Sequence, residues 1–340
     1  TEERVDMELY LDSADRREIE EAFGLGILDG LTTTPTFMHR HGIEDVDAYL
    51  LDLARIVPVL QVEALGDTAD EIRSEAIRQL ELGLEPGRTV FKIPVSLEGI
   101  KACRRLTDEG LMVNVHLVYT LQQAYMAMHA GAAYVCPLVG RLQDQGQDAL
   151  ALVADAVDAV ERYGYETRVM FSSVRHVEHV RNALQLGAHT ITVPFPILAR
   201  LTENVFTSVG TDQFRVHTRM ITRTVGDVMS SVNPTVLADT ELRDAIVSMT
   251  EYGFGCVTVV DGEGNLVGVF TDGDLRRLLQ ANGRDVLDRR MSDLPYGTPI
   301  SIERGVRLNE ADELFHRHKV DNLLVTDRGR PVGMLDIQDL

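Results

Sequence analysis

The chain has 340 residues, 44% of them hydrophobic, and this length accommodates two domains or one large barrel and a smaller module. Its formal net charge of −20 would repel a polyanion, which argues against nucleic acid and anionic membranes as partners. No apolar run of about 18 residues, no basic-then-apolar leader and no CxxC pair is present, so we expect a cytosolic protein without a membrane span or a disulfide framework.

From residue 7 onward, short apolar runs alternate with amphipathic helical stretches. Eight strands are predicted, at residues 8–11, 30–33, 57–63, 90–95, 112–118, 133–138, 168–172 and 190–193. Each precedes a predicted helix, at residues 14–23, 45–56, 69–82, 98–109, 121–129, 148–163, 177–185 and 197–203. Eight such units indicate a (β/α)8 TIM barrel, because the alternative, an open doubly wound sheet, usually has fewer strands. The first glycines also form no G-x-G-x-x-G dinucleotide loop.

One lysine of this barrel has unusual surroundings. Only three of the 33 Lys and Arg residues are lysines, and Lys92 lies within the apolar, β-prone run 89–95. Burying an ammonium there costs on the order of several kcal/mol unless the group is paired or its pKa is lowered. A desolvated lysine can form a Schiff base, which arginine cannot. The alternative is a lysine whose stem packs while its head reaches solvent at the strand end.

The predicted strand ends are rich in polar side chains. They carry Asp12, Thr32, Thr33, Thr34, Gln61, Glu63, Lys92, Asn114, His116, Cys136, Arg141, Ser172, Ser173 and Arg175. A lone polar residue at a strand end is usually a cap or a turn former. Polar residues on almost every strand, at the rim where barrel chemistry takes place, instead predict an active site.

After about residue 219, a unit of roughly 60 residues occurs twice. The first copy has a predicted strand at 235–237, a helix at 241–252 and a hairpin of 257–260 with 266–270, and the second has a strand at 299–302, a helix at 308–318 and a hairpin of 323–325 with 331–335. Each copy ends in a glycine-containing strand and an acidic loop. We therefore predict a barrel domain at 1–220 and an α+β domain at 221–340, with repeats at about 224–282 and 285–340.

Five motifs of the first domain resemble those of the transaldolase family in order and spacing. They are Leu9-Tyr10-Leu11-Asp12, Thr32-Thr33-Thr34-Pro35, Phe91-Lys92-Ile93-Pro94, Tyr134-Val135-Cys136-Pro137-Leu138-Val139-Gly140-Arg141 and Ser172-Ser173-Val174-Arg175. The resemblance covers roughly residues 7 to 215, and the small members of the fructose-6-phosphate aldolase type are most similar in length. It implies an enzyme of carbohydrate metabolism, such as the pentose phosphate pathway, that acts on sugar phosphates.

The resemblance also implies how the reaction proceeds. Lys92 condenses with a ketose carbonyl, and the protonated imine serves as an electron sink, so no metal or other cofactor is expected. Asp12 exchanges a proton with the hydroxyl formed or lost in aldol cleavage. Asn114 hydrogen-bonds the bound ketose, and Gln61 matches the glutamate or glutamine usual on the third strand.

A phosphate site follows from the same resemblance. Arg141, Ser173 and Arg175 hold the phosphate of the substrate, since guanidinium groups match phosphate oxygens. Phosphate also commonly binds after strands 7 and 8 of this barrel. The alternative for Arg175 is an exposed arginine at the start of a helix.

Three positions depart from the family pattern. Thr34 stands where the family has an asparagine that contacts the substrate, and Cys136 replaces a common serine. Cys136 is either a small packing residue near the substrate or a nucleophile, and Lys92 already fills the latter role. His116 replaces a threonine, and it carries a proton, contacts an altered substrate or packs inertly below the lysine.

The C-terminal repeat resembles a tandem CBS (Bateman) pair. Its segment Gly268-Val269-Phe270-Thr271-Asp272-Gly273-Asp274-Leu275-Arg276-Arg277 is similar to the CBS pairs of arabinose-5-phosphate isomerases. The resemblance implies a nucleotide effector whose ribose is held by Thr271 and Asp274. The second copy has Asp336 where threonine is expected, ahead of Asp339, so we expect one good site. The alternative is a dimerisation module without a ligand, and in either case we expect a homo-oligomer.

Three functions are consistent with this sequence. The leading hypothesis is a Schiff-base transaldolase or aldolase that moves or cleaves a three-carbon ketose unit and is regulated through its CBS pair. The second keeps the imine chemistry but acts on a specialised sugar of surface polysaccharide or secondary metabolism, because Thr34 and His116 depart from the family. The third is an inactive sugar-phosphate sensor, which the retention of Lys92 and Asp12 opposes.

Overall fold

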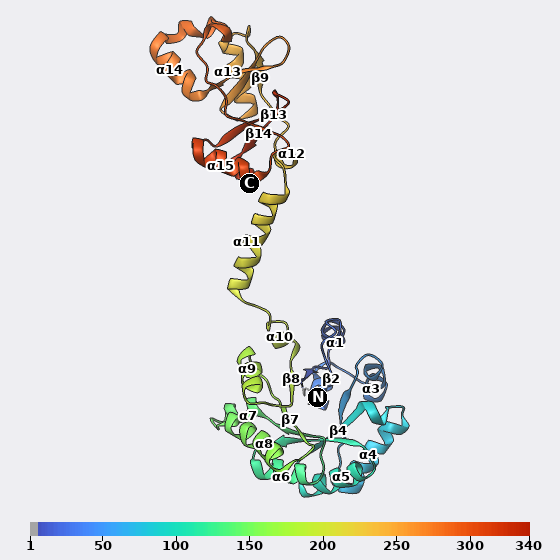
Figure 1. Cartoon of the computed structure of the whole chain (residues 1–340). Helices are drawn as coiled ribbons and strands as arrows, with labels where there is room; N and C mark the ends of the chain where they lie inside the picture. The colour runs from blue at the N-terminus through green and yellow to red at the C-terminus, as the bar shows by residue number, and fades with distance from the viewer. Residues whose placement is uncertain (1–5) are drawn as a thin grey trace. The chain divides into compact units, whose positions relative to one another are not determined.

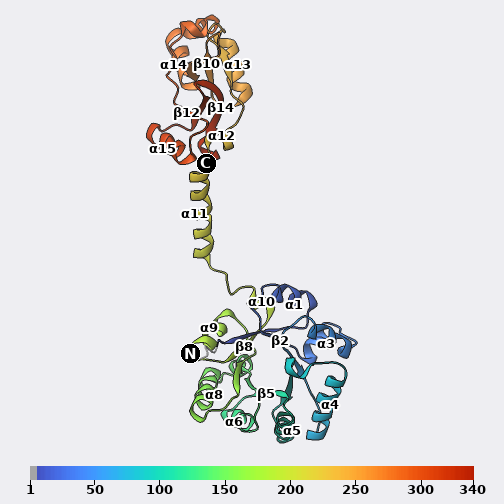
Figure 2. The same ribbon diagram turned by 45° about the vertical axis from the view of Figure 1, so that its right-hand side comes forward.

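The structure is a computed structural model that describes residues 6–340. The chain divides into two compact units, Thr1–Glu203 and Asn204–Leu340 (Figures 1 and 2). This division assigns helix α11 (Val205–Thr222) to the C-terminal unit, whereas the boundary predicted from the sequence lies at 220/221. Within residues 6–340, no helix is long and apolar enough to cross a membrane.

The first unit is a closed barrel of eight parallel strands. They are β1 (Glu8–Asp12), β2 (Gly30–Thr32), β3 (Leu60–Glu63), β4 (Thr89–Pro94), β5 (Met112–Val118), β6 (Tyr134–Pro137), β7 (Arg168–Phe171) and β8 (Thr190–Val193). Strand β1 pairs with both β2 and β8, so the sheet has no edge and the predicted barrel is confirmed over the open sheet. In the β3–β4–β5 register, Lys92 lies level with Glu63 and Asn114.

Helices surround the barrel on its outer side (Figure 1). They are α1 (Arg16–Phe23), α2 (Pro35–Arg40), α3 (Val46–Ala54), α4 (Ala69–Glu81), α5 (Leu97–Asp108), α6 (Leu121–His129), α7 (Val139–Asp144), α8 (Ala149–Tyr163), α9 (Val177–Gln185) and α10 (Phe195–Leu198), with a 3₁₀ turn at Pro86–Arg88. The short helices α2 and α7 were not predicted. The helix predicted at 197–203 is wrong for most of its length, because α10 is a single turn that ends at Leu198.

The strand period of two divides each strand between two hydrophobic clusters. Outward side chains such as Phe91 and Ile93 pack in the large cluster between strands and helices. Inward side chains such as Tyr10, Val90 and Met170 form a separate cluster inside the barrel. Lys92 belongs to the inward set, since it lies between Phe91 and Ile93. The alternation of the strand therefore turns this lysine toward the barrel interior.

The second unit begins with α11 and α12 (Val225–Val228) and contains two three-stranded sheets. The first copy comprises β9 (Thr235–Leu237), α13 (Leu242–Tyr252), β10 (Cys256–Val260), β11 (Leu266–Thr271) and α14 (Asp272–Asn282). The second comprises β12 (Ser301–Glu303), α15 (Leu308–His318), β13 (Asn322–Asp327) and β14 (Arg330–Asp336), with 3₁₀ turns at Gly283–Asp288, Met291–Asp293 and Ile337–Asp339. In both sheets the middle strand pairs in parallel with one neighbour and antiparallel with the other, which confirms the duplication.

Two predictions in this unit need correction. The acidic loop expected after the first hairpin is helix α14, because Thr271 and Asp274 form a capping box that starts a helix there. Helix α11 was not predicted, since its β-branched residues and Gly210 have low helix propensity. None of the α11 side chains is buried within the unit.

Candidate active site

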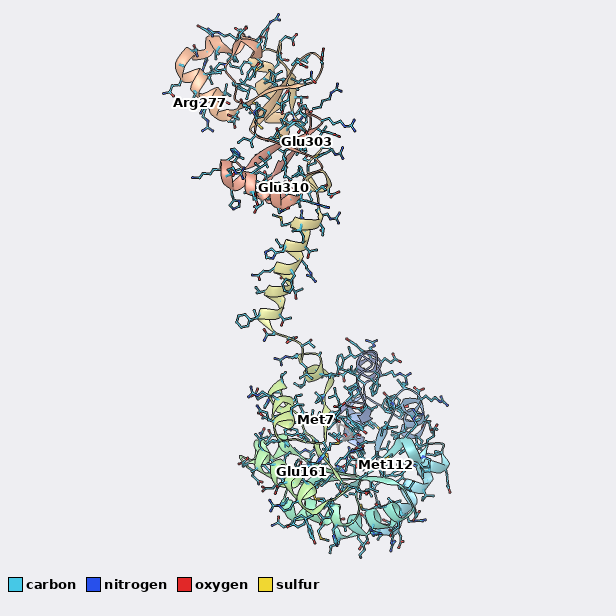
Figure 3. All side chains as sticks on the ribbon, in the orientation of Figure 1. Met7, Met112, Glu161, Arg277, Glu303 and Glu310 are labelled. Atoms are coloured by element: carbon cyan, nitrogen blue, oxygen red, sulfur yellow. The ribbon has the colours of Figure 1, made fainter. Side chains whose placement is uncertain are left out.

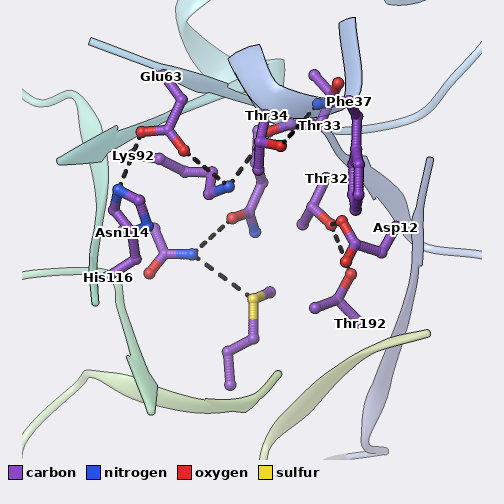
Figure 4. Close-up of polar contacts among 12 residues, drawn as sticks. Asp12, Thr32, Thr33, Thr34, Phe37, Glu63, Lys92, Asn114, His116 and Thr192 are labelled. Atoms are coloured by element: carbon purple, nitrogen blue, oxygen red, sulfur yellow. Dashed lines mark hydrogen bonds and ion pairs between the residues drawn. The ribbon is translucent and has the colours of Figure 1, made fainter. Parts of the chain in front are cut away.

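Lys92 is buried at the polar end of the barrel, with only 5% of its surface exposed. Its Nζ lies 3.0 Å from Glu63 Oε1 and donates a hydrogen bond to the Thr33 carbonyl oxygen at 3.2 Å (Figure 4). The head of the lysine is therefore held inside the barrel, and the alternative of a head that reaches solvent is wrong. An ion pair at this depth offsets the cost of removing the ammonium from water.

Glu63 bridges the lysine and His116. Its second oxygen, Oε2, lies 2.9 Å from His116 Nε2. Burial raises the pKa of Glu63, but the Lys92 charge and the His116 contact outweigh burial, and the net shift is downward. Burial lowers the pKa of His116 against the opposing effect of Glu63, so the imidazole is neutral near pH 7. A carboxylate thus lies between an ammonium and a neutral imidazole (Figure 4).

The structure separates the two polar residues of β3. Asn114 Nδ2 donates a 2.7 Å hydrogen bond to Gln61 Oε1, whereas Glu63 contacts Lys92. Both amides are fully buried, and Gln61 Nε2 and Asn114 Oδ1 lack a hydrogen-bond partner among the described residues. A buried polar atom without a partner costs about 1–3 kcal/mol, so these atoms are ready to bind the hydroxyl groups of a ligand. The sequence marks Glu63 only as a polar strand end, although its two-residue spacing from Gln61 places both on the inward face.

Asp12 occupies the part of the barrel formed by β1, β2 and β8. Its Oδ1 accepts a 3.0 Å hydrogen bond from Thr32 Oγ1, and Thr32 in turn contacts Thr192 Oγ1. Burial raises the pKa of Asp12, while the charges of Lys92 and Arg141 and the Thr32 hydrogen bond act in the opposite direction. A carboxyl with a raised pKa can accept and return a proton closer to neutral pH, as acid–base catalysis requires.

Two loops adjoin where the phosphate site was predicted. A Cβ atom on Gly140 would lie 2.1 Å from the Ser173 carbonyl oxygen and 2.8 Å from Arg175 Cγ and Nε, so the loop after β7 packs directly on the start of α7. Ser173 has a left-handed backbone with φ of 59°. Arg175 is exposed, and its Nη2 donates to Asp144 Oδ2 at 3.0 Å. Arg175 therefore lies exposed, as in the alternative given for this residue, and Asp144 binds one side of its guanidinium.

Arg141 lies one residue after Gly140 and is also exposed. Its positive charge favours the ionised form of Asp12 and the neutral form of His116, so it lies within electrostatic range of both groups. Among the described residues Arg141 forms no ion pair. It is therefore a cation near the polar end of the barrel whose donors are available to an anion.

Thr34 and Cys136 have structural roles that the sequence did not define. Thr34 Oγ1 accepts a 3.3 Å hydrogen bond from Phe37 N and caps α2. Cys136 is buried beside Tyr10 and Tyr134 in the cluster inside the barrel. Burial raises the pKa of the Cys136 thiol to about 11, which keeps it protonated and argues against a nucleophilic role. Their contacts with a substrate stay predictions.

A cavity of about 200 Å³ adjoins Glu63 between β3 and helices α2, α3 and α4. Thr33, Thr34 and Gln79 contribute polar atoms to its lining, and Met38 and Leu50 contribute apolar ones. Thr33 Oγ1 and Gln79 Oε1 are buried and lack partners within residues 6–340. The cavity is thus large and polar enough to hold water.

No group of three or more His, Cys, Asp or Glu side chains in residues 6–340 is arranged to hold a metal ion.

In the second unit, the residues that are predicted to bind a nucleotide also form the caps of helices. Asp274 Oδ2 accepts hydrogen bonds from Thr271 N at 2.9 Å and from Thr271 Oγ1 at 2.7 Å, and its other oxygen contacts Arg277, which is exposed on α14 (Figure 3). In the second copy, Asp339 Oδ2 accepts from Asp336 N at 3.3 Å. Each pair begins at the final residue of the last strand of its copy.

Two family models match the chain. The model for transaldolase/fructose-6-phosphate aldolase matches residues 9–239, and the CBS domain model matches residues 225–281 and 291–340. A protein named "Probable transaldolase" from Anaeromyxobacter dehalogenans (strain 2CP-C) is 37% identical over 211 residues, which cover 61% of this chain and 94% of the relative. Another of that name from Streptococcus equi subsp. equi (strain 4047) is 36% identical over 209 residues, which cover 61% and 96%.

Solved structures resemble about a third of the chain. The CBS-domain containing protein ATU1752 from Agrobacterium tumefaciens is 22% identical and covers 34% of this chain and 89% of its own, with a TM-score of 0.31. The CBS domain protein PAE2072 from Pyrobaculum aerophilum, complexed with AMP, is 18% identical and covers 34% and 89%, with a TM-score of 0.32.

Proposed function

Because the chain belongs to the transaldolase/fructose-6-phosphate aldolase family and carries two CBS domains, we propose that its barrel is a lysine Schiff-base enzyme. It transfers or cleaves a ketose-derived three-carbon unit on sugar phosphates, under the control of a ligand of the CBS pair. The observation that carries this proposal is Lys92, a buried lysine whose Nζ is paired with Glu63 among unpartnered polar groups.

Lys92 supplies the covalent chemistry. Its deprotonated amine attacks the ketose carbonyl carbon, and loss of water gives a protonated imine. The imine withdraws the electron pair of the adjacent C–C bond when that bond breaks. Asp12 takes the proton from the hydroxyl that becomes a carbonyl and returns it when a new aldol bond forms. The raised pKa of Asp12 suits this exchange.

The remaining groups bind the sugar phosphate. Asn114 Oδ1 and Gln61 Nε2, an acceptor and a donor without partners, hydrogen-bond its hydroxyl groups. Arg141 and Arg175, with Ser173, bind its phosphate at the adjoining loops after β6 and β7. Each uses donors that match phosphate oxygens.

A second function is a Schiff-base reaction on a specialised sugar. The Glu63–His116 contact favours it, because His116 replaces the family threonine and changes the shape and charge next to Lys92. An inactive sensor is the third reading, and the retained Lys92 and Asp12 argue against it. The first two functions differ in the ketose that reacts, and the third predicts that no ketose reacts.

Borohydride trapping tests the Schiff base. Fructose 6-phosphate, dihydroxyacetone and a panel of other ketoses are incubated with the full chain and borohydride, and the added mass is located by peptide mapping. We expect label on Lys92 and complete loss of turnover in Lys92→Met. Lys101→Met is the matched control, since Lys101 is exposed on α5 and paired with Glu98. Label on Lys101, no label with any ketose, or an active Lys92→Met variant would contradict the mechanism.

A further inference from the structure

We propose that Glu63, positioned by His116, moves protons between the Lys92 nitrogen and the ketose oxygen while the imine forms. This inference rests on the proposed Schiff-base function and assigns a step that Asp12 does not serve. Asp12 is bonded to Thr32, in the part of the barrel formed by β1, β2 and β8. Glu63 instead contacts Lys92 and His116, across β3, β4 and β5.

The two oxygens of Glu63 have different neighbours. Oε1 lies 3.0 Å from Lys92 Nζ and Oε2 lies 2.9 Å from His116 Nε2. The side chains of Lys92, Glu63 and His116 are 6%, 7% and 11% exposed, so bulk water scarcely screens their charges. Glu63 therefore touches the atom that becomes the imine nitrogen, and its other oxygen lies beside a neutral ring without a hydrogen-bond partner among the described residues, so it has a free acceptor position.

The proton balance of the reaction explains why such a group is needed. An ammonium and a ketone become a protonated imine and one water molecule. The C–N bond forms, the C–O bond breaks, and two protons leave nitrogen and finish on the released oxygen. A carboxylate beside the nitrogen can take each proton and pass it to that oxygen, ending in its starting state. No oxidant, reductant or other reactant is required.

The charges around Glu63 fit a relay. Lys92 faces Glu63 from β4, and His116 faces it from β5. The charge of Arg141 disfavours a proton on His116, and the charges of Asp12 and Lys92 attract each other. On the cavity side, the ionisable lining groups are Asp47, Glu75 and Arg78, and Arg78 is paired with both carboxylates. Lys92 is thus the one described cation in contact with Glu63. Transfer of its proton to Glu63 leaves two neutral groups side by side, so the step creates no isolated buried charge.

The cavity beside Glu63 gives the released water a place to go. Its lining includes Glu63 itself and the unpartnered atoms Thr33 Oγ1 and Gln79 Oε1. A buried water typically needs two to four polar partners, and these atoms supply them. The Thr33 carbonyl oxygen also accepts a hydrogen bond from Lys92, so both residues that hold the lysine, Thr33 and Glu63, line the cavity.

Rapid trapping of the imine in Glu63→Gln separates this role from that of a simple counter-ion. If Glu63 only balances the Lys92 charge, glutamine removes the carboxylate that stabilises the ammonium, and the trapping rate at pH 7 should be equal or faster. A proton relay instead predicts a rate at least about 100-fold slower with fructose 6-phosphate and with dihydroxyacetone. A rate equal to or above that of the parent overturns the inference.

Matched variants and a second measurement complete the test. Glu75→Gln alters another carboxylate of the same cavity and should trap at the parental rate. Asp12→Asn should trap at nearly the parental rate but lose turnover. Should Glu63→Gln fail to fold, the parental trapping rate is compared in H₂O and D₂O, and an equal rate in both overturns the inference. A parent chain that traps no ketose contradicts the Schiff-base function instead.

His116 is a positioning residue, and its test is a pH profile. Protonated His116 would compete with Lys92 for Glu63, so the trapping rate should fall in acid partly through this ring. His116→Gln keeps a donor beside Glu63 but does not titrate. In this variant the acid limb, which is the fall of the trapping rate in acid, should therefore occur at lower pH than in the parent. An unchanged acid limb would remove His116 from the relay.

Discussion

Single side chains at the polar end of the barrel divide into those that the fold has paired and those that it has left free. Thr34 caps α2 and Thr32 binds Asp12, so their hydroxyl groups are already in use. Arg141 has no ion-pair partner within residues 6–340, whereas Arg175 shares its guanidinium with Asp144. A phosphate would therefore gain a free cation at Arg141 but must displace a carboxylate at Arg175.

This difference predicts unequal effects of two substitutions. Arg141→Ala should weaken binding of a phosphorylated ketose by about 30- to 100-fold, about 2–3 kcal/mol, since it removes a charge-assisted contact. Arg175→Ala should cost less, and Asp144→Ala, as the control, should not weaken binding. Competition by inorganic phosphate measures each effect, with dihydroxyacetone as the unphosphorylated comparison. Equal losses for both substrates would show that the arginines are structural.

The sequence identified the residues of the site better than their contacts. The apolar alternation around Lys92 was enough to predict an inward lysine on a strand. It could not show that Glu63 rather than Gln61 meets this lysine, because both lie on the inward face and only the β3–β4 register sets their depth. Register depends on the closure of the whole barrel, which no local pattern records.

Among the elements, the strands matched their predictions within about three residues, because alternation and turn residues mark strands clearly. The short helices α2 and α7 were missed, since one turn or two of helix leaves little periodic signal. Helix α14 was missed for another reason. The resemblance to CBS domains gives Thr271 and Asp274 to a ligand, although the same pair also forms a capping box that starts a helix.

The start of α9 holds the loop that carries Ser173 and Arg175. His179 Nδ1 accepts a hydrogen bond from Arg175 N at 3.2 Å, and its Nε2 lies 2.7 Å from Gln143 Oε1 on α7. His179 is fully buried, and its ring centre lies 3.8 Å from that of His176. Burial lowers the pKa of His179 to about 4, helped by the charges of His176 and Arg175.

This lowered pKa predicts acid sensitivity. An unfolded histidine takes up a proton below about pH 6.5, while folded His179 resists protonation until about pH 4. Unfolding therefore binds a proton in this window, and the free energy of unfolding should fall by on the order of 3 kcal/mol from pH 6.5 to 4 through this residue. Urea melts at several pH values should show a shallower slope in His179→Gln and no change in His217→Gln, an exposed control on α11. An unchanged slope in His179→Gln would contradict the assignment.

For the whole molecule, the question is how a CBS pair can influence a barrel. The duplicated sheets and the barrel have separate hydrophobic cores, so each can change state as a unit. Coupling between them requires a ligand that binds one state of the CBS pair more tightly. Thr271 and Asp274, at the start of α14, are the groups that we propose for the ribose of such a nucleotide.

The contacts of Asp274 determine which variant can test nucleotide binding. Asp274→Ala would also remove the N3 half of the capping box of α14, and the resulting loss of helix stability could mimic a lost ligand site. Asp274→Asn keeps an oxygen acceptor for Thr271 but removes the charge. Thr224 and Asp227 form the same kind of capping box at α12, so Asp227→Asn is a control with matched geometry.

We expect one nucleotide to bind per chain, because the second copy has Asp336 where a threonine is expected, ahead of Asp339, and this extra carboxylate disfavours a phosphate nearby. Calorimetry with ATP, ADP, AMP and CMP-linked sugars should show binding to the full chain and to Asp227→Asn, and weak binding to Asp274→Asn. Coupling of about 1–3 kcal/mol would change substrate affinity by about 5- to 150-fold. If no nucleotide binds, the pair serves assembly, and if Asp274→Asn binds as well as the parent, the Asp274 carboxylate does not hold the ligand and the proposed site is wrong.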